Sequence, residues 1–117
     1  MRLLDGDSHP LAIDEINDII EHREPYFGEL LGALIQKRQE ALQRGELDAH
    51  FQPYLLAGGR EAYEIVLCTN RGGITAVYVI TRGRLRLLTV VAFDDFMREA
   101  ISGQALTEAI MRAAERI

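Results

Sequence analysis

Three apolar runs separated by two short turns fill residues 61–93, EAYEIVLCTNRGGITAVYVITRGRLRLLTVVAF. The runs are rich in Val, Ile, Leu and Tyr, which favour extended backbone, and the turns at 70–73 and 82–83 contain glycine. Strands joined by such short turns pair in antiparallel fashion, because a parallel pair needs a long crossover. The segment therefore predicts three antiparallel strands over residues 61–69, 74–81 and 84–93.

Two helices are predicted ahead of the strands. Ser8 and Pro10 mark the start of the first, because a serine hydroxyl can cap free amides and proline fits the first helical turn. Pro25 ends this helix and can open a longer second one, whose apolar stripe stops at Gly45. Helices joined so tightly should pack as a hairpin. Their acidic side chains, Glu15 among them, are interpreted as a solvent-facing surface.

The remaining segments predict a loop and two C-terminal helices. Residues 46–60 combine proline, paired glycines and apolar anchors, which is typical of a connecting loop. Asp94 or Asp95 can cap a short helix that runs through Ile101. A terminal helix follows Gly103, and the residues expected to line its apolar face are Leu106, Ile110, Ala113 and Ile117.

These elements define the expected fold class: α+β, with an N-terminal helix hairpin packed on a three-stranded antiparallel sheet and with C-terminal helices. The strands are apolar on both faces in their middles, so the hairpin should cover one face and other residues at least part of the second. A chain of 117 residues can bury one core but is short for two, so residues 1–117 are expected to form a single domain.

The composition is that of a globular protein without a membrane segment. Hydrophobic residues make up 48% of the chain and charged residues 26%. The apolar runs are far shorter than the roughly 20 residues that cross a bilayer, and residues 1–7 lack the apolar core of a signal peptide. We therefore expect a cytoplasmic protein. The single Cys68 lies in an apolar segment without a neighbouring base, which favours a buried, inert thiol over a catalytic nucleophile.

Positive charge is concentrated in one part of an acidic chain. The protein has 13 basic and 18 acidic residues and a net charge of −5, yet residues 60–86 hold five arginines against two glutamates. The five are Arg60, Arg71, Arg82, Arg84 and Arg86. We expect them to form a basic tip or stripe at one end of the sheet, suited to a phosphate or an acidic partner. The alternative is that they solubilise a turn and discourage pairing at a sheet edge.

Four stretches follow one another in an order that matches a known family. They are ALQRGELDAHFQPYLLAGG at 41–59, YEIVL at 63–67, VYVI at 77–80 and GRLRLLTVVAF at 83–93. Two helices, a glycine-containing loop, three antiparallel strands and a terminal helix resemble the RelE/HigB/ParE superfamily of toxins from toxin–antitoxin modules, including its phage-type branch. The resemblance runs from about Leu11 to the C-terminus and is carried mostly by apolar positions.

The resemblance implies a place in a toxin–antitoxin module, where members cut messenger RNA with basic residues and a His or Tyr on and around this sheet. Three places where the family often has basic residues hold other side chains here: Val66, Thr75 or Ala76, and Asp94–Asp95. These departures favour a protein that acts mainly by binding a partner, either an antitoxin or ribosome-associated RNA, with nuclease activity weak or absent.

Two alternatives stay open beside this interpretation. In the first, the protein is an active ribosome-dependent endoribonuclease of messenger RNA, in which Tyr78 assists proton transfer while the phosphate is steadied by Arg60, Arg82, Arg84 and Arg86. In the second, it is an acidic immunity or adaptor protein that makes no contact with RNA. A homodimer is compatible with each of these functions.

The histidines provide no metal site in the sequence. His9, His22 and His50 lie at a helix start, a helix end and a loop, and no pair has ligand spacing within one element. No cysteine stands beside them. We therefore expect neither a bound metal nor a cofactor.

Overall fold

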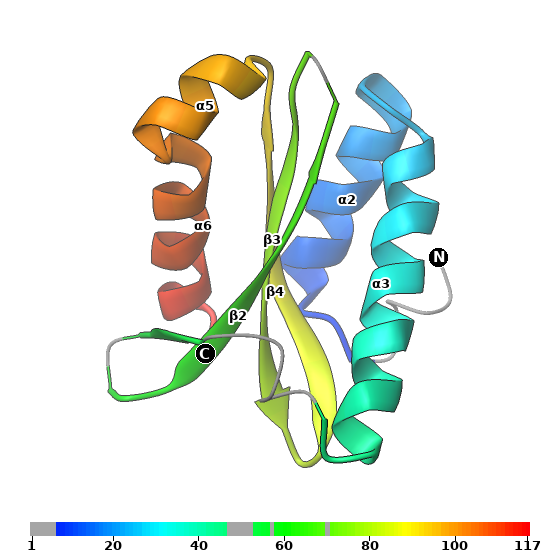
Figure 1. Cartoon of the computed structure of the whole chain (residues 1–117), viewed down its shortest axis with the longest axis vertical. Coiled ribbons are helices and arrows are strands. Elements are labelled where there is room, and N and C mark those ends of the chain that lie inside the picture. The colour runs from blue at the N-terminus through cyan, green and yellow to red at the C-terminus, as the bar shows by residue number, and fades with distance from the viewer. Residues whose placement is uncertain (1–6, 47–52, 57, 70) are drawn as a thin grey trace.

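The computed structural model describes residues 7–46, 53–56, 58–69 and 71–117, which build helices on both sides of one sheet (Figure 1). The helices are α2 (Pro10–His22), α3 (Tyr26–Gln43), α5 (Phe96–Ser102) and α6 (Gln104–Glu115). The strands are β1 (Tyr54–Leu55), β2 (Glu61–Cys68), β3 (Gly73–Thr81) and β4 (Arg84–Phe93). This is the α+β class that the sequence predicts. Among the described residues, no helix combines the length and the apolar character needed to cross a membrane.

The three predicted strands are confirmed as β2, β3 and β4. The strands lie in the order β1-β2-β3-β4, and every neighbouring pair is antiparallel. β3 is an inner strand and its side chains are buried from Gly73 to Val79, which explains why its sequence is apolar on both faces. Val77 pairs with Thr89 but Tyr78 with Leu87, so the strand β4 carries one extra residue, a β-bulge, at Leu88.

A fourth strand, β1, lies in the segment 46–60 that was expected to be a loop only. Its two residues pair with the start of β2, and the Leu56 N–H donates to the Arg60 carbonyl at 2.8 Å. Gly58 and Gly59 have φ angles of 87° and 81°, a left-handed conformation that glycine adopts without steric cost. The sequence prediction was wrong here because two residues are too few for a recognisable strand pattern.

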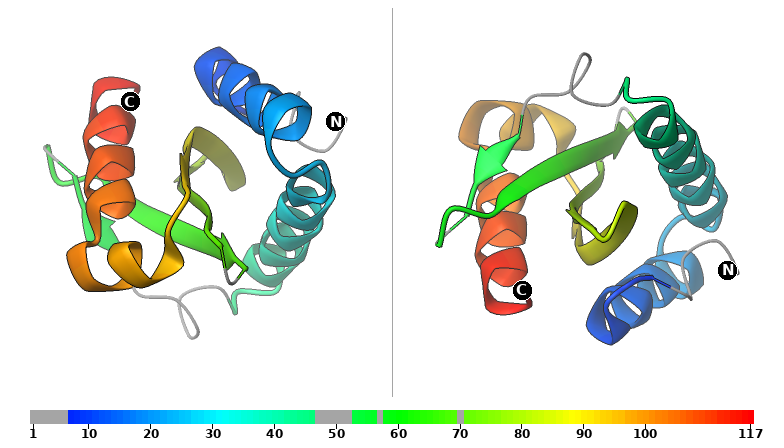
Figure 2. Two further views of the ribbon diagram at one scale, coloured as in Figure 1. Left: turned by 90° about the horizontal axis from the view of Figure 1, so that it is seen from above. Right: turned by 90° about the horizontal axis from the view of Figure 1, so that it is seen from below.

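The sheet lies between two helical layers, as the two end-on views in Figure 2 show. The helix hairpin α2–α3 covers one face, and the core between them includes Ile16, Leu31, Ile65, Tyr78 and Leu87. α6 covers the other face, where its side chains meet Val77, Val79, Leu88 and Val91. The predicted cover on both faces is therefore confirmed. Burial of each such side chain stabilises the fold by about 1.5–3 kcal/mol.

The buried stripe of α6 differs from the one expected. The fully buried residues are Ala105, Ala109 and Ala113, spaced one turn apart, whereas Ile110 is only partly buried and Ile117 is 56% exposed. Leu106 is also half-buried. Small alanine side chains allow the helix to lie close to a sheet whose own residues fill the space between them. Of the four predicted residues, Ala113 is confirmed as buried, whereas Leu106 and Ile110 are only partly buried and Ile117 is exposed, because hydropathy alone favours the larger side chains.

The start of α2 is capped by His9 and not by Ser8. The His9 Nδ1 atom accepts a hydrogen bond from the Leu11 N–H at 3.1 Å, and Pro10 takes the first helical position as predicted. Ser8 is buried, with 8% of its surface exposed, and makes no cap. At α5 the cap is Asp95, whose Oδ1 accepts from the Arg98 N–H at 3.1 Å.

Candidate partner-binding site

The β3–β4 turn carries an arginine in a backbone conformation that arginine seldom adopts. Arg82 and Gly83 have φ angles of 55° and 75°, the combination found in the type I′ turn of a two-residue hairpin. The predicted tight turn is therefore confirmed. Asn and Gly favour the first position of such a turn, whereas a long side chain with positive φ is strained by roughly 1 kcal/mol. Arg82 is exposed and makes no hydrogen bond or ion pair within the described residues.

A glutamine from α3 holds this hairpin in place. The Gln39 Nε2 donates to the Gly83 carbonyl at 3.1 Å, and its Oε1 accepts from the Leu85 N–H at 2.9 Å. One side chain thereby satisfies both the Gly83 carbonyl and the Leu85 N–H. Sequence reasoning missed Gln39 because its partners lie more than 40 residues away along the chain, and no local spacing indicates them.

Arg60, the residue before β2, stabilises the same end of the sheet. Its Nη2 donates to the Ile80 carbonyl at 2.8 Å and to the Thr81 Oγ1 at 2.6 Å. The residue therefore lies where the sequence placed it, beside the hairpin. Its guanidinium is occupied by internal contacts, so its role in the structure is to brace the end of β3.

Arg84 and Arg86 both reach Asp7, as the alternation of side chains along a strand predicts. The Arg84 Nε pairs with the Asp7 Oδ2 at 2.7 Å, and the Arg86 Nη1 donates to the Asp7 carbonyl at 3.3 Å. The side chain of Arg84 is 61% exposed, so water weakens this ion pair and an external carboxylate can compete for it. Arg82 and Arg84 are thus the accessible cations of the hairpin.

Arg71 does not belong to this group. It lies in the β2–β3 turn, at the opposite end of β3 from Arg82, and nine strand residues separate the two turns by about 30 Å. The expectation that all five arginines share one end of the sheet was therefore wrong. Consecutive turns of an antiparallel meander lie at opposite ends of the sheet. Arg71 is also exposed. Its backbone N–H donates to the Thr69 Oγ1 at 3.3 Å, but its guanidinium makes no ion pair with the residues that the structure describes, so it is a natural control for charge.

Tyr78 lies inside the layer between the sheet and α3. Its side chain is fully buried, its ring stacks on Tyr63 at a centroid distance of 5.4 Å, and its hydroxyl receives the Arg38 Nη1 at 3.2 Å. Arg38 also donates to the Glu64 carbonyl at 2.7 Å. Burial raises the pKa of Tyr78, although the neighbouring Arg38 opposes this shift. The structure therefore separates Tyr78 from the accessible arginines.

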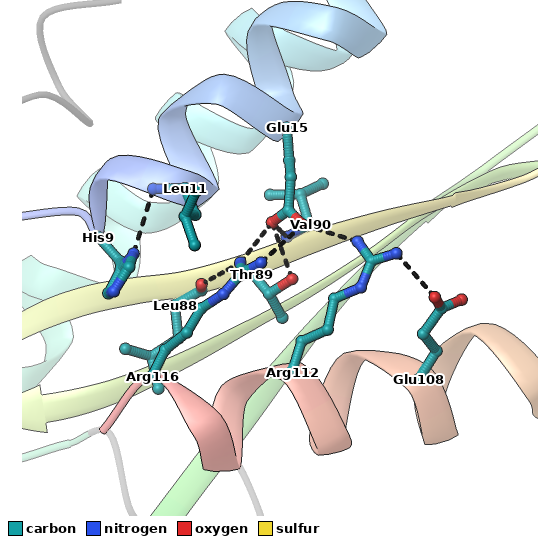
Figure 3. Close-up of polar contacts among 9 residues, drawn as sticks. All are labelled: His9, Leu11, Glu15, Leu88, Thr89, Val90, Glu108, Arg112 and Arg116. Carbon is teal, nitrogen blue, oxygen red and sulfur yellow. Dashed lines mark hydrogen bonds and ion pairs between the residues drawn. The ribbon is translucent and has the colours of Figure 1, made fainter.

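A second polar cluster crosses the outer edge of β4 (Figure 3). The Glu15 carboxylate receives Arg116 in a two-pronged contact of 2.7 and 3.1 Å, and Arg112 at 2.6 Å. It also accepts from the Thr89 hydroxyl at 2.9 Å and from the Val90 N–H at 3.1 Å. The interpretation of Glu15 as a solvent-facing acid was wrong, because α6 and the strand edge both turn donors toward it.

The environment of Glu15 acts on its pKa in opposite directions. Burial alone would raise the pKa, since only 18% of the side chain is exposed. The hydrogen bonds from Arg116, Val90 and Thr89 outweigh this effect and hold the pKa of Glu15 below its usual value. The carboxylate is therefore charged at neutral pH and ties α2 to α6.

Several elements together satisfy the outer edge of β4. The Leu87 carbonyl accepts from the His9 N–H at 2.8 Å, and the Leu88 carbonyl from the Arg116 Nη1 at 2.9 Å. The Glu15 side chain accepts from the Val90 N–H, and the Gln39 side chain accepts from the Leu85 N–H. Donors and acceptors from three helices or their caps therefore occupy positions where another strand would otherwise pair. Coverage of this kind protects an edge strand from pairing with another chain.

Cys68 is exposed, contrary to the buried thiol expected from its apolar surroundings. On β2, Ile65 points to the helix hairpin and is 1% exposed, whereas Val66 on the opposite face is 47% exposed. Cys68 shares the face of Val66, and α6 packs on β3 and β4 beyond it. The apolar run correctly predicted a strand. It did not indicate which residues of that strand a helix would cover.

The described residues contain no group of three His, Cys, Asp or Glu side chains able to hold a metal ion. His50, one of the three histidines considered above, lies outside the described residues. Comparison with protein-family models, with curated proteins and with solved structures finds no match to this chain.

Proposed function

We propose that the protein is a divergent RelE/HigB-like binding protein of the cytoplasm, which holds an acidic segment of a partner protein on its β3–β4 hairpin. The RelE/HigB resemblance makes an antitoxin the partner to test first. The observation that carries the proposal is Arg82, an exposed cation kept in a strained left-handed conformation and without a hydrogen bond or ion pair to any residue that the structure describes. Strain of this kind is found most often where a residue is retained for function.

The construction of the hairpin supports binding. Gln39 and Arg60 hold the turn and the end of β3 through four hydrogen bonds, so the backbone beneath Arg82 is already ordered. A preordered site loses less entropy on binding than a mobile one. Arg84 adds a second cation, whose partner Asp7 can be exchanged for an external carboxylate.

The charge of the chain favours a short acidic peptide over RNA. A net charge of −5 repels a long polyanion at a distance, and RNA affinity rests on many phosphate contacts. Two accessible arginines can satisfy two or three carboxylates. A partner protein with a short acidic segment therefore matches these two positive charges better than a nucleic acid does.

The position of Tyr78 favours binding over strand cleavage. Cleavage by a neighbouring 2′-hydroxyl requires a proton acceptor and a donor beside the phosphate. The Tyr78 hydroxyl instead contacts Arg38 between the sheet and α3, and its raised pKa keeps it protonated. An endoribonuclease would need its proton-transfer groups elsewhere.

The proposal is tested by fluorescence anisotropy with two labelled probes of equal charge, a Glu/Asp-rich peptide and a single-stranded RNA. We expect the peptide to bind more tightly than the RNA. Replacing both accessible cations, Arg82→Ser with Arg84→Ser, should weaken peptide binding about 5- to 25-fold, as loss of two surface charge contacts predicts.

The matched control is Arg71→Ser, compared with Arg82→Ser alone, because each substitution removes one positive charge and Arg71 lies at the opposite end of the sheet. It should change peptide affinity less than about twofold. Equal losses in both variants would mean that net charge alone governs binding, and the proposal would be wrong. Tighter binding of the RNA would favour the ribosome-associated alternative.

A further inference from the structure

The residues just before α2 lie against the outer edge of β4, beside the Arg82 hairpin. The His9 N–H donates to the Leu87 carbonyl at 2.8 Å, as a residue of a neighbouring strand would. Ser8, next to it, is buried. His9 and Ser8 are therefore fixed on the strand edge, and they hold Asp7 over the first residues of β4.

Asp7 presents two different oxygen atoms to two arginines of β4. Its Oδ2 lies 2.7 Å from the Arg84 Nε, and its backbone carbonyl accepts from the Arg86 Nη1 at 3.3 Å. An acidic residue of any peptide carries the same two groups, a side-chain carboxylate and a backbone carbonyl. Asp7 therefore shows how β4 can receive one acidic residue of a partner, and it occupies that place itself.

The contact of Asp7 is built so that it can open without unfolding the helix behind it. The side chains of Arg84 and Asp7 are 61% and 41% exposed, so water screens both charges and the pair is weak. Asp7 also precedes the His9 cap and the first helical residue, Pro10. Asp7 can therefore move away while the bond from His9 to Leu87 and the start of α2 remain.

We propose that Asp7 is an internal competitor, which holds Arg84 and Arg86 in the free protein and is displaced by an acidic residue of the partner. Arg82, which makes no hydrogen bond or ion pair with the described residues, is open to the partner from the outset. A segment with two carboxylates, one for Arg82 and one that replaces Asp7, is therefore favoured over a segment with one. Because the displacing group belongs to the partner, this role of Asp7 rests on the function proposed above.

Competition of this kind lowers the apparent affinity for the partner. A ligand that needs the open site binds in proportion to the fraction of molecules in which the site is open. An exposed ion pair of ordinary strength keeps the site closed for more than half of the time. Removal of the Asp7 carboxylate should therefore raise the affinity for an acidic peptide by about two- to sixfold.

Fluorescence anisotropy with the labelled Glu/Asp-rich peptide tests the competition. Asp7→Asn removes the carboxylate but keeps the backbone carbonyl, and it should bind the peptide about two- to sixfold more tightly than the wild type. Asp14→Asn is the matched control, because it removes the same charge from an exposed position of α2 and should change the affinity by less than about 1.5-fold. In an Arg84→Ser background, Asp7→Asn should give no gain, since the competition acts through Arg84.

NMR relaxation of the wild-type protein gives a measurement that needs no substitution. When the peptide saturates the protein, the heteronuclear NOE of the Asp7 amide should fall, because its ion pair has been exchanged. The amides of Ser8 and His9 should keep their values, since the strand edge still holds them. Far-UV circular dichroism confirms that each variant used in the anisotropy series is folded.

The outcomes separate the role of Asp7 from the function proposed above. If the wild type binds the peptide but Asp7→Asn gains no more than Asp14→Asn, the competition is wrong and the binding function stands. An Asp7 amide that stays ordered at saturation, or a gain that persists in the Arg84→Ser background, would overturn the competition in the same way. If the peptide binds neither the wild type nor Asp7→Asn, the binding function is wrong and the role of Asp7 is overturned with it.

Discussion

The carboxylate of Glu15 on α2 accepts hydrogen bonds from both terminal nitrogens of Arg116, the C-cap residue of α6, at 2.7 and 3.1 Å, across the edge of β4. The two residues lie 101 positions apart and come from helices on opposite faces of the sheet. α6 itself buries fully only three alanines, which contribute little apolar area. This ion pair is therefore a principal link between the two helical layers.

Removal of the Glu15 charge should destabilise the protein. Glu15→Gln leaves Arg116, whose side chain is 13% exposed, without a countercharge and weakens the contacts of Arg112 and Val90. We expect the free energy of unfolding to fall by about 2–3 kcal/mol, measured by urea denaturation. Glu21→Gln on the exposed side of the same helix should change it by less than about 0.5 kcal/mol. Equal effects of the two substitutions would contradict the role of Glu15.

The same carboxylate should make stability depend on acid pH. The pKa of Glu15 is lower in the folded protein than in the unfolded chain, so its contribution is complete above the unfolded value of about 4.3. It should be lost as the pH falls through the lower folded value. The difference in unfolding free energy between wild type and Glu15→Gln should therefore be constant near neutrality and shrink below roughly pH 4. If the difference in unfolding free energy grows on acidification, the lowered pKa of Glu15 is contradicted.

Relief of strain at Arg82 should stabilise the fold. Arg82→Asn puts a residue that favours positive φ at the first position of the type I′ turn, which should add about 0.5–1 kcal/mol to the unfolding free energy. The midpoint of thermal unfolding should rise accordingly. Arg71→Asn, at a turn position without positive φ, should give no such gain. If Arg82→Asn is neutral while Arg71→Asn stabilises, the arginine conformation is not strained.

The two adjacent glycines at the start of β3, Gly72 and Gly73, should resist substitution for steric reasons. A Cβ atom on Gly73 would lie 2.0 Å from the Leu67 carbonyl oxygen, which belongs to the backbone of the neighbouring strand. Gly73→Ala should therefore cost about 3 kcal/mol or more, because the β2–β3 pair must separate. Gly83→Ala has open space around the new Cβ and only an unfavourable φ, so it should cost about 1 kcal/mol. Urea denaturation of both variants measures whether Gly73→Ala lowers the free energy of unfolding more than Gly83→Ala does.

Local patterns were sufficient to predict most of the elements. The apolar runs of β2 to β4, the Arg82–Gly83 turn and the proline between α2 and α3 each reflect the backbone preferences of a few adjacent residues. Burial could be inferred for the sheet as a whole, since strands with apolar residues on both faces must be covered twice. The exposure of Cys68 could not, because it depends on where a distant helix ends its contact with the sheet.

The amino-acid sequence by itself determined the class of the fold, the antiparallel meander and the presence of arginines at its turns, because these follow from short-range periodicity and steric preference. Only the tertiary structure decided which polar groups meet. Glu15 with Arg116, Gln39 with Gly83 and Arg84 with Asp7 are pairs separated by 44 to 101 positions. Such contacts arise from the way the layers stack and where strands end, and no spacing within one element encodes them.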